Sequence, residues 1–93
     1  MKTTATRTVT VTNPQGLHLR PCSVIVDTVR NYRAHVVVHK GNRSTNAASI
    51  FGLLSLAANS GTELVLSATG ADAEEALDAV ASLFHEEFEM VYA

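Results

Sequence analysis

Apolar residues in this chain recur at two different spacings, and the order of the two spacings limits the fold more than any other feature. Residues 7–12 alternate valine with threonine, which is the two-residue period of a half-buried strand. After the turn residues 13–16, apolar residues fall three and four positions apart, as on one face of a helix, at Leu19, Cys22, Ile25, Val26 and Val29. We therefore expect a strand followed by a helix that begins near His18.

The middle of the chain predicts a hairpin and a short helix. Residues 34–39 are rich in β-branched side chains, Lys40-Gly41-Asn42 can turn the chain, and residues 43–46 can return alongside. Ser49 can cap a helix that ends at Asn59-Ser60-Gly61. The stripe of that helix that would pack on a core is Ile50, Leu53, Leu54 and Ala57.

The last third repeats the alternation of strand and helix. Residues 63–69 alternate again, and Asp72 with Glu75 predicts a capping box for a final helix. The apolar face of this helix is expected at Leu77, Val80, Phe84, Phe88 and Val91. The whole order is βαββαβα, which predicts an α+β fold of two layers, with three helices covering one face of a four-stranded antiparallel sheet.

Length and composition agree with a single domain over residues 1–93. Of these residues 46% are hydrophobic and 17% are charged, as in globular proteins. The apolar stretches are too short to span a bilayer and the polar start lacks a signal-peptide core, so we expect a cytoplasmic protein. Cys22 is the only cysteine, which rules out an internal disulfide and removes the usual thiolates of a structural zinc site.

Charge is distributed unevenly along the chain. All seven Lys and Arg residues precede Ser44, where only Asp27 opposes them, and the other eight acidic residues follow. This asymmetry could steer an acidic partner to one face, or the opposite charges could neutralise one another within the fold. A basic first half also raises the alternative of a nucleic-acid-binding α+β domain, although Tyr32 is the only aromatic residue before Phe51 for base stacking. A domain that binds a small regulatory molecule is a third alternative.

Residues 16–21, Gly-Leu-His-Leu-Arg-Pro, place a histidine and an arginine where the loop becomes a helix. The first N–H groups of a helix and its dipole form an anion site, and Arg20 adds a guanidinium that can hold phosphate oxygens. The same field helps to keep His18 neutral, with a ring nitrogen ready for nucleophilic attack. On these residues alone, His18 is more often a surface residue or a loose cap.

Other reactive residues carry weaker hypotheses. Cys22 lies on the apolar helix stripe, which favours a buried structural thiol over catalysis or metal binding. His35 and His39 share a strand face without a third convergent ligand, so we interpret both as surface residues and expect no metal site.

The segment GLHLRPCS at 16–23 resembles the active-site segment of HPr, the histidine-containing phosphocarrier protein of the bacterial phosphotransferase system. The resemblance runs from about Arg7 to Phe84 and includes NAASIFGLLSL at 46–56, SGT at 60–62 and GADAEEAL at 70–77. It implies the strand order 1-4-2-3 in the sheet. It also implies a monomeric carrier without a cofactor, an intermediate in phosphoryl transfer rather than a stand-alone enzyme.

The resemblance also implies roles for individual residues. His18 would accept a phosphoryl group on Nδ1 from Enzyme I, which is charged by phosphoenolpyruvate, and would pass it to a sugar-specific IIA component. Leu19 and Arg20 would hold the phosphate, with Arg20 stabilising its charge. The residues that would contact Enzyme I and IIA are Leu19, Ile50, Phe51 and Leu54.

Ser49 and Phe51 each keep two interpretations. In the resembling family an HPr kinase phosphorylates the serine that matches Ser49, so this residue is either a plain N-cap or a cap that is also a regulatory site, and the chain could act mainly through it without sugar transport. Phe51 lies one residue off the apolar stripe, which favours an exposed docking residue over one that covers a core edge.

The chain departs from the family pattern at several positions. Leu19 and Cys22 stand where small residues are usual, and Ala48 stands where lysine is common. No Lys or Arg follows Arg43, and residues 85–93 run beyond the usual end. The bulk of Leu19 beside the phosphate puts partner choice and transfer rate in doubt.

Overall fold

The structure is a computed structural model, and it describes residues 3–88. Four strands and three helices follow one another in the predicted order βαββαβα. Their bounds are β1 Thr3–Thr10, α1 Leu19–Val29, β2 His35–Lys40, β3 Arg43–Asn46, α2 Ile50–Ser55, β4 Glu63–Gly70 and α3 Ala73–His85.

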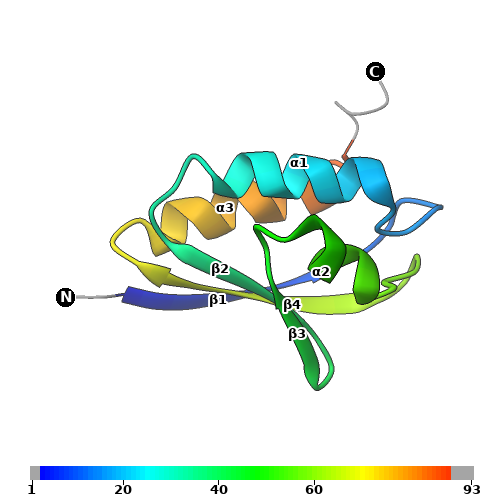
Figure 1. The fold of residues 1–93 in the computed structure, drawn as a ribbon, viewed down its shortest axis with the longest axis horizontal. Helices are drawn as coiled ribbons and strands as arrows, with labels where there is room; N and C mark the ends of the chain where they lie inside the picture. Colours follow the sequence, from blue (N-terminus) through cyan, green and yellow to red (C-terminus); the bar gives the residue numbers. More distant parts are fainter. Residues whose placement is uncertain (1–2, 89–93) are drawn as a thin grey trace.

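The strands form one antiparallel sheet in the order β1-β4-β2-β3, as expected. All three helices lie on the same face of this sheet, so the molecule has two layers (Figure 1). Leu66 of β4 lies opposite Arg7 of β1 on one side and opposite Val38 of β2 on the other. The strand that comes last in sequence is therefore central in the sheet, and it ties the first strand to the hairpin.

The core lies between the sheet and the helices. In β4 the alternation puts Leu64, Leu66 and Ala68 inward, each no more than 1% exposed, and the intervening residues outward. From the helix layer, α1 and α3 bring their apolar faces onto these residues. None of the helices within residues 3–88 is long and apolar enough to cross a membrane.

The first strand is placed earlier than predicted, over Thr3–Thr10 rather than 7–12. Val11 is nevertheless fully buried, because the chain stays fixed beyond the strand. The Val11 N–H donates to the Thr62 carbonyl at 2.8 Å, and the Val11 carbonyl accepts from the Gly61 N–H at 2.6 Å. The alternation of valine and threonine thus indicated the buried positions correctly but not the last residue of the strand.

Helix α2 also ends earlier than predicted, at Ser55 instead of near Asn59. Ala57 adopts a left-handed conformation (φ 51°) and is exposed, so its place on the core stripe was wrong. Leu56 and Ala58, on either side of it, are buried instead. Residues after a helix commonly turn left-handed, usually at glycine, and here an alanine does so without the sequence signal that glycine would give.

The predicted capping box at the start of α3 is wrong. Asp72 is the N-cap residue, but its carboxylate makes no capping hydrogen bond. It accepts instead from the backbone N–H groups of Arg33 (2.9 Å) and Ala34 (2.7 Å), which join α1 to β2. The Arg33 N–H contributes most to lowering the pKa of the Asp72 carboxyl group. Asp72 therefore connects two loops rather than only starting a helix.

The end of the last helix differs from the prediction as well. Helix α3 ends at His85, and Phe88 follows in a turn with φ 58°. Phe88 is still 1% exposed and contacts Phe84 edge to face, with ring centroids 5.1 Å apart. Val91, expected on the same helix face, lies outside the described residues.

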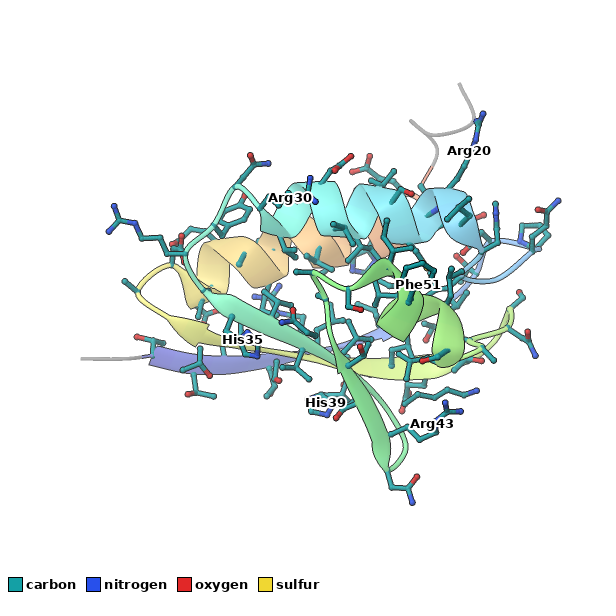
Figure 2. The ribbon with its side chains drawn as sticks, in the orientation of Figure 1. Arg20, Arg30, His35, His39, Arg43 and Phe51 are labelled. Carbon is teal, nitrogen blue, oxygen red and sulfur yellow. The ribbon has the colours of Figure 1, made fainter. Side chains whose placement is uncertain are left out.

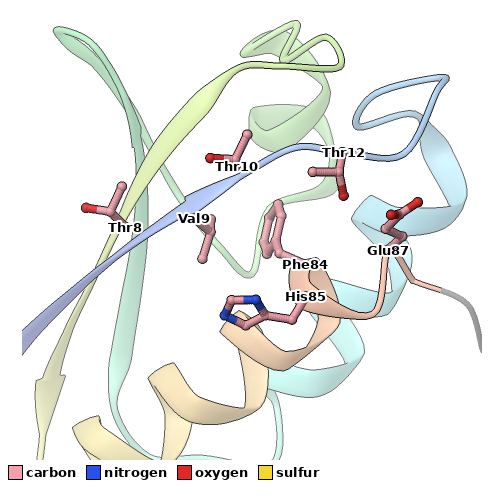
Figure 3. A pocket seen from close by; sticks show the side chains of 7 residues that line it. All are labelled: Thr8, Val9, Thr10, Thr12, Phe84, His85 and Glu87. Atoms are coloured by element: carbon pink, nitrogen blue, oxygen red, sulfur yellow. The ribbon is translucent and has the colours of Figure 1, made fainter.

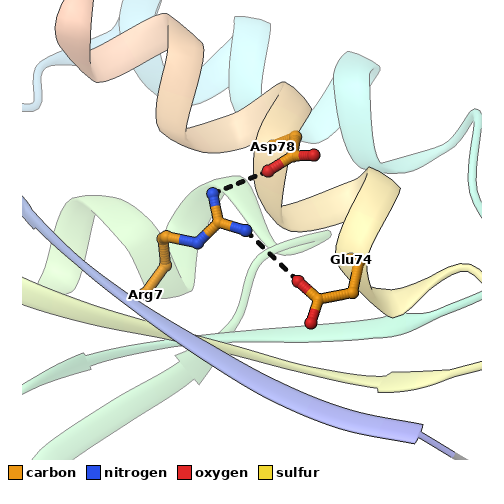
Figure 4. A network of polar contacts seen from close by, with 3 residues as sticks. All are labelled: Arg7, Glu74 and Asp78. Atoms are coloured by element: carbon orange, nitrogen blue, oxygen red, sulfur yellow. Dashed lines mark hydrogen bonds and ion pairs between the residues drawn. The ribbon is translucent and has the colours of Figure 1, made fainter.

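Opposite charges partly neutralise one another within the fold. The Arg7 guanidinium contacts Asp78 at 2.7 Å and Glu74 at 3.2 Å, both on α3 (Figure 4). Arg30 lies 3.7 Å from Asp27 on α1. These pairs are exposed, so they add little stability. Of these pairs, only the Arg7 contacts join a basic residue of the first half to acidic residues of the second.

Candidate functional site

His18 is the N-cap residue of α1, as predicted. Its backbone is extended (φ −88°, ψ −170°), and its carbonyl accepts the Cys22 N–H at 3.2 Å. The side chain makes no capping hydrogen bond, unlike the usual Ser, Thr, Asp or Asn at this position. His18 is half-buried rather than enclosed. The imidazole therefore stands at the positive end of a helix of 11 residues, within reach of solvent.

The loop that carries His18 is held against the segment after α2. The Leu17 N–H donates to the Ala58 carbonyl at 2.9 Å. Gly16 has a positive φ of 69°, and a Cβ added there would lie 2.6 Å from the Ala58 oxygen. Glycine is needed at this position both for its conformation and for the close approach of the two backbones. These contacts fix where α1 begins and so where His18 stands.

Leu19 and Arg20 are exposed at the start of α1. Arg20 extends from this end of the helix away from the sheet (Figure 2). Leu19 is 58% exposed, although the spacing of apolar residues placed it on the same face as Cys22. The buried face begins instead at Pro21, which occupies the first turn without costing a backbone hydrogen bond. The helix start thus presents an arginine and an apolar side chain next to His18.

Helix α2 packs against α1 and carries the second group of predicted residues. Ser49 is its N-cap, and the Ser49 hydroxyl accepts the Gly52 N–H at 3.0 Å, as expected. Phe51 is 84% exposed, while Ile50 and Leu54 are half-buried against the core. The exposed position of Phe51 favours the docking interpretation over the one in which it covers a core edge.

Two cations hold the other end of α2. Lys40 Nζ donates to the carbonyls of Leu56 at 2.9 Å and Ala57 at 3.2 Å, and Arg43 donates to Ser55 at 2.7 Å. Cations are favourable at a helix C-terminus, where carbonyls lack partners within the helix. The β2–β3 hairpin therefore fixes the orientation of this short helix, a contribution that the sequence pattern did not indicate.

The other residues considered for catalysis or metal binding, Cys22, His35 and His39, are not part of the candidate site. Cys22 is fully buried, and burial raises the pKa of its thiol to about 11, which leaves it protonated near neutral pH. His35 and His39 lie on β2, away from Arg20 (Figure 2), and His39 Nε2 lies 2.9 Å from the Ser67 hydroxyl. Within residues 3–88 no three His, Cys, Asp or Glu side chains are grouped to hold a metal ion.

A pocket of about 310 Å³ lies between β1 and the end of α3 (Figure 3). Its described lining does not include His18, Arg20 or Ser49. The residues that line it are Thr8, Val9, Thr10, Thr12, Phe84, His85 and Glu87. The candidate site is therefore the exposed start of α1 with the neighbouring face of α2, not this pocket.

Comparison with known proteins agrees with this geometry. Residues 5–86 match the family model described as the PTS HPr component phosphorylation site. The chain belongs to the HPr family. It is 36% identical to the phosphocarrier protein HPr of Treponema pallidum over 83 residues, which cover 89% of this chain and 94% of that protein. It is 40% identical to the HPr-like protein Crh of Bacillus subtilis over 72 residues, 77% of this chain and 85% of Crh.

Solved structures of HPr-type proteins have the same fold. A crystal structure of HPr from Thermoanaerobacter tengcongensis is similar with a TM-score of 0.88 and 36% identity, covering 91% of this chain and 96% of that one. Crh of Bacillus subtilis has been solved as an intertwined, domain-swapped dimer, with a TM-score of 0.73 and 39% identity over 80% of this chain and 85% of Crh. The chain is thus an HPr-type protein, which favours the phosphocarrier interpretation over a nucleic-acid-binding domain.

Proposed function

We propose that this HPr-type phosphocarrier takes a phosphoryl group from Enzyme I onto a ring nitrogen of His18 and passes it to a IIA component. The observation that carries the proposal is the position of the half-buried imidazole at the N-cap of α1, at the positive end of the helix. Arg20, exposed two residues further along the chain, supplies a cation for the phosphate. The family gives the class of reaction, and the position of His18 at the start of α1 supports it as the acceptor.

The transfer exchanges one bond to phosphorus for another. The lone pair of the unprotonated ring nitrogen attacks phosphorus, and the bond between phosphorus and the donor breaks, with its electron pair returning to the donor. The other ring nitrogen keeps its proton. Charge on the three equatorial oxygens is stabilised by the helix N-terminus and by Arg20. The second transfer is the reverse of these steps onto IIA, so the protein carries the group without hydrolysing it.

The experiment that tests this function uses the whole chain with phosphoenolpyruvate and a cognate Enzyme I. Intact-mass measurement is expected to show one added phosphate, which is lost on brief acid treatment, as expected for phosphohistidine. Adding a IIA component should then return the protein to its original mass. A protein that stays unmodified with an Enzyme I that phosphorylates another HPr would reject the proposal.

Leu19, Ile50, Phe51 and Leu54 are the proposed docking surface for Enzyme I and IIA. We predict that Phe51→Ser raises the KM for transfer from Enzyme I about tenfold, because a mostly exposed aromatic side chain is the kind of residue that anchors an interface. The fold should not change, since Phe51 contributes little to the core. The matched control is Val65→Ser, which removes an exposed apolar residue from the sheet. Equal KM values for the two variants would contradict this surface.

Ser49 is the proposed site of regulation by an HPr kinase. Its hydroxyl already accepts the Gly52 N–H, so a phosphate there would meet the start of α2 while adding negative charge beside Ile50 and Phe51. We predict that ATP and a competent HPr kinase label the wild type and Ser60→Ala, but not Ser49→Ala. Failure to label the wild type would leave Ser49 as a plain N-cap, and the carrier function would stand.

We propose that the protein acts in the cytoplasm, together with Enzyme I, its phosphoenolpyruvate-dependent phosphoryl donor. We also propose that the carrier acts as a monomer, since the site at α1 and α2 is complete within one chain. The swapped dimer of Crh shows that a related chain can assemble differently. Sedimentation of the purified protein at working concentration distinguishes the two states.

A further inference from the structure

Asn13 is the one polar residue whose side chain is buried within residues 3–88. It is 2% exposed and lies at the beginning of the loop that leads to His18. Buried polar side chains are rare because they give up hydrogen bonds to water, and those that persist usually hold a particular arrangement. Asn13 lies five positions before the proposed acceptor, so we expect its buried amide to hold a particular arrangement of this loop.

The contacts of Asn13 lead directly to His18. Asn13 Nδ2 donates to the Gly16 carbonyl, and the Gly16 N–H donates back to the Asn13 carbonyl at 3.0 Å. The same Gly16 carbonyl accepts the His18 N–H at 3.0 Å. The Gly16 carbonyl oxygen thus accepts hydrogen bonds from both the Asn13 side chain and the His18 backbone. The bond from the Gly16 N–H to the Asn13 carbonyl closes the turn between residues 13 and 16.

Packing alone does not explain why an asparagine occupies position 13, because the oxygen of its side-chain amide is left without a partner within residues 3–88. Asn13 Oδ1 is buried and has no hydrogen-bond partner among the described residues. A buried acceptor without a partner destabilises a fold, so an apolar residue of similar size would serve the core at least as well. What only the amide supplies is the N–H that holds the Gly16 carbonyl.

We propose that Asn13 is a positioning residue for phosphoryl transfer, which sets the orientation of His18 through the Gly16 carbonyl. The inference rests on the proposed function of His18. It predicts that losing the Asn13 donor lets the turn shift and misplaces the imidazole, even where the fold is kept. Displacements of about 1 Å at a reacting group slow transfer by up to roughly a hundredfold.

The test replaces the donor by a group whose donor capacity depends on pH. In Asn13→Asp the carboxylate cannot donate to Gly16, so transfer from Enzyme I at neutral pH should be at least tenfold slower than in wild type. When the buried carboxyl group is protonated, its O–H can donate again. The backbone amide resonance of His18 should then return toward its wild-type position at the same pH. Wild-type spectra at each pH correct for changes in the His18 resonance that do not depend on residue 13.

Two further variants separate positioning from stability. Asn13→Ala removes the donor without adding a charge, and it provides the rate comparison if Asn13→Asp does not fold at neutral pH. Val36→Ala weakens the core at a buried position on β2, away from the loop, and should keep the wild-type transfer rate. Wild-type rates and His18 resonances in both Asn13 variants would overturn the inference.

The two proposals fail in different ways. If the wild type accepts no phosphate but Asn13→Asp still shifts the His18 amide resonance reversibly with pH, the role of Asn13 in holding the turn stands and the carrier function falls. If the wild type is phosphorylated and the Asn13 variants match it in rate, the function stands and the positioning role falls.

Discussion

The His18→Ala protein will accept no phosphate from Enzyme I and phosphoenolpyruvate, whereas His35→Ala will accept as much as the wild type. The reason is that only a nitrogen nucleophile at the helix start can form the proposed phosphorus–nitrogen bond, and alanine offers none. His35 is an exposed histidine on β2, far from the start of α1, so it controls for the loss of an imidazole. Intact-mass measurement after a fixed incubation gives the result.

The fold of His18→Ala should be kept, because the His18 side chain is half-buried and is not part of the hydrophobic core. Thermal unfolding of the two variants and the wild type checks this. An acid-labile phosphate that persists in His18→Ala would show that another residue is the acceptor. Equal loss of phosphate in His35→Ala would show that the effect is not specific to the helix start.

Gly16→Ala should both destabilise the protein and slow phosphoryl transfer, while Gly41→Ala should do much less. Both glycines have similar positive φ values, 69° and 60°. A Cβ at Gly41 meets nothing within 4 Å, but one at Gly16 would lie 2.6 Å from the Ala58 oxygen. The left-handed conformation alone costs about 1 kcal/mol, and the forced separation of the two backbones adds about 1–3 kcal/mol at Gly16.

Denaturant unfolding measures the first effect, and the rate of phosphorylation by Enzyme I under folding conditions measures the second. The difference between the two variants isolates the contact with Ala58 from the cost of a positive φ. If both variants lose the same stability and keep the same rate, the loop is not held where the structure places it.

The order of elements and the inward faces of the sheet could be predicted because they follow from spacing alone. The alternation at 63–69 indicated Leu64, Leu66 and Ala68 as core residues, and all three are buried. The strand order 1-4-2-3 needed the family resemblance, since spacing does not say which strands pair. The sequence likewise indicated the start of α1 at His18 and the cap at Ser49, which depend on neighbours in the chain.

The features that sequence reasoning missed depend on the three-dimensional arrangement rather than on the spacing of residues. Asp72 follows a capping pattern, yet its carboxylate binds the backbone at 33 and 34, nearly forty positions earlier. Ala57 fits a helical stripe, but the chain leaves the helix before reaching it. The role of Asn13 depends on its burial, which no local spacing predicts. The Asp72 contact and the burial of Asn13 appear only once the sheet has brought separate segments together.

The most direct measurement of the central claim is the location of the phosphate by nuclear magnetic resonance. The protein is labelled with ¹⁵N in its histidines and phosphorylated by Enzyme I, and nitrogen–phosphorus coupling is recorded with the His18 ring assigned. The account predicts coupling to a ring nitrogen of His18 and unchanged rings at His35, His39 and His85. Coupling at any other histidine, or a phosphate attached to oxygen with the His18 ring unmodified, would contradict it.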